Sequence, residues 1–152
     1  MMQLTKNFFL KEFIVSPTAA RMGINNYPGP AEIAAIEAVC INVLQPLRNW
    51  YKRRIRIGCG YRSPALNAIT PGAAADSQHK KGEAADIDTL NDNGKLFKYI
   101  KNNLPFDQLI WEFGDDENPD WIHVSYKIDR TNRFKVLKAY RDEYGLHYAN
   151  VP

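Results

Sequence analysis

Cysteine and histidine are both scarce in this chain of 152 residues, which has two cysteines and three histidines. Because Cys40 and Cys59 form no CxxC pair, a zinc site built from cysteines is excluded. A single disulfide between them is compatible with the sequence, but nothing requires one. Cys40 falls on the apolar stripe of an expected helix and Cys59 on an alternating strand, so both are predicted to be small buried hydrophobic residues.

Long hydrophobic runs are also missing. The apolar residues near the N-terminus are interrupted by Lys6, Lys11 and Glu12, which excludes a signal peptide of ordinary length. No stretch reads as long enough to span a membrane. We therefore expect synthesis in the cytoplasm and no membrane partner.

A strong charge of one sign is absent, since the formal net charge is +3 and the pI is about 8.8. The densest basic run is 52–56, where Arg54 and Arg56 alternate with Ile55 and Ile57. This alternation favours the solvent face of a strand over a polyanion site. We expect no nucleic-acid partner; a nucleic-acid binder would instead lose affinity steeply with salt.

The composition, 45% hydrophobic and 24% charged, is that of a folded globular chain. The length fits one domain over 1–152, with an N-terminal arm over 1–30 and a core over 31–152. Apolar residues at helical spacing predict a helix after Pro30, and Pro46 should kink its end. Strands are predicted at 54–59, 84–88, 106–113 and 121–126, with an edge strand at 134–140. Helices first and strands after indicate an α+β fold with a largely antiparallel sheet.

The segment Ser77–Asp86 carries the first candidate chemistry. His79 lies at the end of a loop and Asp86 on the strand that follows. Gly82 permits a sharp turn between them, and Ala84 and Ala85 allow close packing of the backbone. The spacing can bring an imidazole and a carboxylate to one point.

The segment Asp120–Ser125 carries the second. His123 lies within a predicted strand, and Asp120 lies at its start. On an ideal strand these two would face opposite sides, so an irregular start after Pro119 is needed to bring them together. Two histidines and one carboxylate form a common catalytic zinc set. The residues alone, however, fit a buried structural histidine and a capping aspartate better.

Together these segments resemble the zinc peptidases of the D-Ala-D-Ala carboxypeptidase group, which includes phage cell-wall lysins and shares a fold core with the hedgehog signalling domain. The family pattern S-x-H-x-x-G-x-A-x-D, followed downstream by E/D-x-x-H, matches Ser77 to Asp86 and then Asp120 to His123. A Tyr-Arg-Ser segment upstream, here Tyr61–Ser63, is also typical of the family. The resemblance extends from about 55 to 126.

The resemblance implies that His79, Asp86 and His123 bind Zn²⁺. It implies that Asp120 is the general base, that Arg62 binds a substrate carboxylate or the oxyanion, and that Ser77 hydrogen-bonds the substrate backbone. Many relatives have Glu in place of Asp120. Glu112 and Glu117 are therefore alternative bases if Asp120 points away.

The implied function is zinc-dependent hydrolysis of a bond in peptidoglycan stem peptides, by a monomer. The bond is either the D-Ala-D-Ala terminus or an internal bond cut by a phage-type lysin. Action at the bacterial cell wall would then follow release by lysis or a membrane pore. A non-catalytic wall-binding or phage structural module that keeps the metal is the alternative, and the presence of Asp120 counts against it.

Overall fold

The computed structural model describes all 152 residues. The chain begins with an arm of two short helices, α1 (Leu10–Ile14) and α2 (Pro17–Met22). Phe8 and Phe13 of this arm are buried and belong to the main hydrophobic core. The arm is therefore fixed to the core by its aromatic residues.

The predicted helix after Pro30 forms three consecutive pieces: α3 (Pro30–Val39), the π-helical turn η1 (Cys40–Leu44) and α4 (Gln45–Tyr51). Pro46 lies just after the π-turn. Because proline has no N–H and its ring crowds the preceding turn, a widened turn before it satisfies the backbone without ending the helix. The expected kink thus appears as a π-turn.

This helix corrects one expectation from the sequence. Over Pro30–Tyr51 it has 22 residues and a mean hydropathy of 1.2 in its most apolar window, enough by length and composition to cross a membrane. Its apolar side chains instead belong to the core, among them Ile36, Val43 and Leu47. A core helix accounts for the same composition.

Six strands form one sheet in the order β1-β2-β4-β3-β5-β6. All pairs of neighbouring strands are antiparallel except β3 with β5. The α+β class with a mostly antiparallel sheet is therefore confirmed. The strand bounds are β1 (Arg56–Cys59), β2 (Ala84–Asp88), β3 (Gln108–Glu112), β4 (Trp121–Ser125), β5 (Lys135–Asp142) and β6 (Gly145–Asn150).

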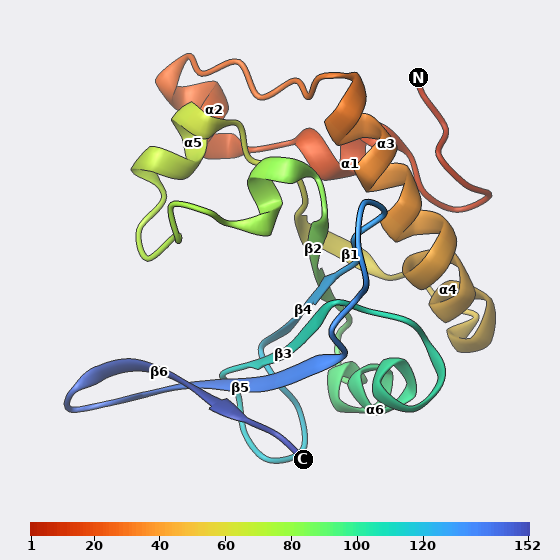
Figure 1. Cartoon of the computed structure of the whole chain (residues 1–152), viewed down its shortest axis with the longest axis vertical. Coiled ribbons are helices and arrows are strands. Elements are labelled where there is room, and N and C mark those ends of the chain that lie inside the picture. Colours follow the sequence, from red (N-terminus) through yellow and green to blue (C-terminus); the bar gives the residue numbers. More distant parts are fainter.

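The last two strands differ from the prediction. The strand predicted at 134–140 is β5, but it lies inside the sheet, because the unpredicted β6 pairs with its outer side. The parallel pairing of β3 with β5 requires a crossover, which no local pattern reveals. In Figure 1 the β5–β6 hairpin extends away from the helices.

The two faces of the sheet differ in character. One face packs on α3, α4 and α6 (Asn93–Asn103) through buried residues such as Ile87, Leu109 and Ile122. The other face carries Asp86, His123 and Glu112. Two short helical segments, α5 (Pro64–Ile69) and η2 (Gln78–Lys81), lie between β1 and β2 in the chain.

Candidate metal centre and active-site cleft

The polar face of the sheet lines a cleft of about 690 Å³. Strand register explains why these side chains meet, since Asp86 pairs with His123 and His123 pairs with Ile110. Residues paired across antiparallel strands point to the same face. Glu112 is two positions from Ile110 and therefore shares that face.

His79 enters the cleft from η2 rather than from the sheet. Ser77 caps this short helix, its hydroxyl oxygen accepting a hydrogen bond from the His79 backbone N–H at 3.3 Å. Gly82 ends it with a φ of 71°, and a Cβ there would lie 2.4 Å from the backbone oxygen of Glu32. Only glycine fits this turn, as the sequence predicts.

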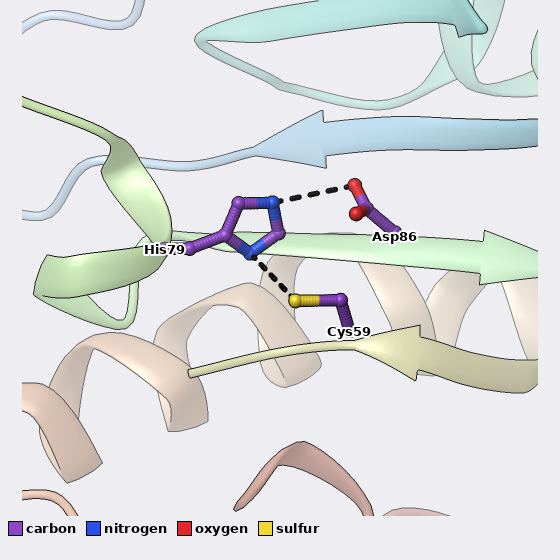
Figure 2. Close-up of side chains that lie close together, drawn as sticks. All are labelled: Cys59, His79 and Asp86. Atoms are coloured by element: carbon purple, nitrogen blue, oxygen red, sulfur yellow. Dashed lines mark hydrogen bonds and ion pairs between the residues drawn. The ribbon is translucent and has the colours of Figure 1, made fainter. Parts of the chain in front are cut away.

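The three predicted ligand residues come together around one carboxylate oxygen. Asp86 Oδ1 lies 3.3 Å from His79 Nε2 and 3.1 Å from His123 Nδ1. The two imidazole rings meet edge to face, with centroids 5.1 Å apart. Figure 2 shows the Asp86 carboxylate at the Nε2 edge of the His79 ring.

The electrostatics of this group favour a positive charge. Burial alone lowers the pKa of His79, but the Asp86 carboxylate outweighs it and raises that pKa to about 10. Burial opposes ionisation of Asp86, yet the two imidazoles hold its pKa well below its usual range. Burial lowers the pKa of His123. The buried Asp86 carboxylate that stabilises a protonated imidazole would also stabilise a bound metal cation.

Two imidazoles and a carboxylate are ligand types that zinc prefers. Ligand atoms at 2.0–2.1 Å from a tetrahedral zinc lie about 3.3 Å from one another, close to the two separations around Asp86 Oδ1. His79 Nδ1 is 2.6 Å from the Gly60 carbonyl oxygen and donates to it, which fixes the tautomer and leaves Nε2 as the ligand atom.

Cys59 corrects the prediction made for it. It is only half-buried. Cys59, His79 and Asp86 offer ligand atoms within 4.8 Å of one another, so the absence of a CxxC pair does not exclude a cysteine ligand. Its sulfur, however, is 3.8 Å from His79 Nδ1, the nitrogen that donates to Gly60. Figure 2 shows Cys59 and Asp86 at opposite edges of the ring. The role of His123 as the third ligand stays a prediction. Cys40 is fully buried, and both cysteines are free.

Asp120, predicted to be the general base, lies outside the cleft. Asp120 is exposed, does not line the cleft, and immediately precedes β4, so the irregular start that would turn it toward His123 is not found. Its backbone N–H donates to the backbone oxygen of Glu112, so the β3–β4 hydrogen-bond ladder continues to Asp120. On a regular strand, residues three apart point to opposite faces, so Asp120 points away from His123.

Glu112, kept as an alternative from the sequence, lies in the cleft. Its side chain is 7% exposed and makes no hydrogen bond to the protein. Burial, reinforced by the nearby Asp86 carboxylate, raises its pKa to about 7. The second alternative, Glu117, is exposed and lies outside this cleft.

Arg62 and Ser77 both line the cleft. The Arg62 guanidinium donates to the Ser77 hydroxyl at 3.1 Å, while its Nε is buried without a partner. Arg62 therefore has hydrogen-bonding capacity left for a substrate. The third histidine, His147, lies on β6 and contacts Asp142, away from the metal-site residues.

The chain was compared with families of known proteins and with curated proteins. No curated protein matches the chain. A family model described as Peptidase M15 matches residues 6–125, which include His79, Asp86, Glu112 and His123. The matched segment covers well over half of the chain, and the chain belongs to the M15 family of D-Ala-D-Ala carboxypeptidase-like zinc peptidases.

Proposed function

We propose that this metallopeptidase hydrolyses a peptide bond in the stem peptides of bacterial peptidoglycan and so acts at the cell wall. The observation that carries the proposal is the position of Glu112. A buried carboxyl without a protein partner shares one cleft and one sheet face with Asp86 and His123. A purely structural metal site has no use for such a group.

His79 Nε2, Asp86 and His123 would hold the metal. Zinc bound there supplies a Lewis acid that lowers the pKa of water and polarises the substrate carbonyl. The protein provides the geometry: η2 and Gly60 orient His79, and the β2–β4 ladder orients the other two.

Glu112 acts as the general base. One carboxylate oxygen takes a proton from the attacking water and later delivers it to the amine of the leaving peptide. Burial of Glu112 beside the Asp86 carboxylate raises its pKa above the ordinary value, which increases its basicity as a proton acceptor. Arg62 donates hydrogen bonds to the oxyanion or to a carboxylate of the substrate.

The shape of the cleft favours an internal bond over a terminal one. The cleft is lined both by Arg62 with residues of the loop 71–77 and by Leu137, Leu146 and Tyr148 of the β5–β6 hairpin. A peptide can therefore extend on both sides of the metal-site residues. Removal of terminal D-Ala is the alternative, with Arg62 binding the free carboxylate.

The test is digestion of purified peptidoglycan, with and without a chelator, read by mass spectrometry beside elemental analysis of the protein. One zinc per chain and chelator-sensitive fragments are expected, and the fragment masses identify the bond. Zinc without fragments would favour the non-catalytic wall-binding module. A folded sample that takes up no metal, even with added zinc, would contradict the site.

A further inference from the structure

The C-terminal hairpin contributes a second part of the cleft. Strands β5 and β6 lie beyond residue 125, outside the segment that matches the family. Residues from both strands nevertheless line the cleft. Figure 1 shows the hairpin continuing the sheet outward from β3. The cleft is thus longer than the matched segment alone would make it.

Register places alternate β5 residues on the cleft face. Leu137 pairs with Ile110 and Ala139 pairs with Glu112, and Leu137, Ala139 and Ile110 form a small buried apolar cluster. Lys135 and Arg141 are two positions from these residues and share their face. The hairpin therefore presents an apolar floor with a cation at each end.

These two cations are uncompensated. Neither Lys135 nor Arg141 forms an ion pair, whereas neighbouring Arg133 is held by Asp107 at 2.7 Å. The Arg141 guanidinium lies over the Phe113 ring, 5.3 Å from its centroid, which orients it without neutralising it. The lining residues from β5 and β6 include no carboxylate, so this end of the cleft is positive.

We propose that the β5–β6 hairpin is a specificity element in which Lys135 and Arg141 bind a carboxylate of the substrate peptide. The inference rests on the proposed peptidase function and deepens it. β5 lies three strand spacings from β2, about 14 Å. An extended peptide covers this in about four residues, so the recognised carboxylate lies some four residues from the bond cut.

Three synthetic peptides test the inference. The first is the pentapeptide L-Ala-γ-D-Glu-L-Lys-D-Ala-D-Ala, and the others carry a carboxamide in place of each free carboxyl in turn. Kd is measured by calorimetry, and KM and kcat by product release. We expect one carboxamide to weaken binding about tenfold, because a charge-assisted hydrogen bond is lost.

Variants locate that effect. Arg141→Gln and Lys135→Gln should each reduce the preference for the carboxylate, and the double variant should abolish it with kcat little changed. Lys138→Gln is the matched control: it removes a lysine from the same strand, but Lys138 lies outside the cleft and pairs with Asp116. All three exchanged side chains are at least partly exposed, so the variants should fold.

The outcomes separate this inference from the peptidase function. If the peptides bind with a preference for the carboxylate that the hairpin variants lose, but none is cleaved, the inference is supported and peptidoglycan hydrolysis is contradicted. Cleavage with a preference that survives in the double variant would overturn the inference alone. Equal loss of preference in Lys138→Gln would also overturn it, because a general charge effect would then suffice. Absence of binding by every peptide would contradict both.

Discussion

The two ends of the cleft are built differently. At the β2–β4 end, His79 and His123 are 3% and 8% exposed, and Asp86 contacts both. At the β5–β6 end, Lys135 and Arg141 are exposed and have no ionic partner. Buried paired groups hold a fixed geometry, whereas exposed unpaired cations remain free to meet different ligands.

We infer that the β2–β4 end of the cleft carries the chemistry and the β5–β6 end recognises the substrate. The chemistry requires ligand atoms placed within tenths of an ångström, and burial with fixed hydrogen bonds provides this. Recognition of a charged peptide requires complementary charge, which an exposed hairpin provides at little cost in stability. Substitutions at the two ends should therefore fail in different ways.

The largest effect is expected at the metal end. His123→Ala removes one of three proposed ligands and should lower the zinc content of the protein. It should also lower kcat/KM by about a thousandfold or more. His147→Ala, on the hairpin, is the matched control and should retain both. Elemental analysis and peptidoglycan digestion measure the two quantities. Full activity in His123→Ala would remove it from the site.

A smaller effect, confined to catalysis, is expected at the base. Glu112→Gln should retain zinc and lower kcat by about 10²- to 10⁴-fold. Asp120→Asn, outside the cleft, should change kcat by less than a factor of about three. The reverse result would return the base to Asp120 and would require β4 to begin differently from the arrangement described.

Asp107 connects the two ends, and its loss should act on stability. It is fully buried, and its carboxylate accepts hydrogen bonds from Arg133 and Gln78. Asp107→Ala leaves cations without their partner and should cost about 3–5 kcal/mol of unfolding free energy. Asp116→Ala, which breaks the exposed pair with Lys138, should cost less than about 1 kcal/mol. Urea unfolding measures both.

The same residue gives a pH dependence. Burial opposes ionisation of Asp107, but hydrogen bonds from Arg133 lower its pKa from 3.8 to about 2. The folded state therefore binds fewer protons than the unfolded state between these values, and stability falls as pH decreases through them. The contribution is about 2 kcal/mol, fully present above pH 4. The gap between wild type and Asp107→Ala should narrow by this amount from pH 5 to pH 2, and a constant gap would contradict the assignment.

The smallest effect is expected on β1, away from both ends. Arg56→Gln breaks an exposed ion pair with Asp88, whose atoms are 2.7 Å apart. Such pairs contribute about 0–1 kcal/mol, so unfolding free energy and kcat/KM should both stay near wild type. If the protein binds DNA tightly and this substitution abolishes the binding, the basic run at 52–56 is a polyanion site, contrary to the interpretation of its alternating charges.

Much of the fold could be predicted because its signals are local. The strand at Ala84–Asp88 and the helix after Pro30 follow from periodicity and turn residues over short windows. The strand β6, Gly145–Asn150, could not be predicted in this way, because it is short, mostly exposed and shows no clear alternation. Its pairing depends on β5, not on its own residues.

The site divides in the same way. The sequence by itself determined the residue types and spacings: His79 and Asp86 on either side of the Gly82 turn, and His123 within a strand. Their convergence on Asp86 Oδ1 agrees with that spacing, and their metal-binding role stays a prediction. Only the tertiary structure placed Glu112 in the cleft and Asp120 outside it, because this depends on which strand face each occupies. That face is set by the pairing of β3 with β4, a long-range contact that three-residue spacing cannot fix.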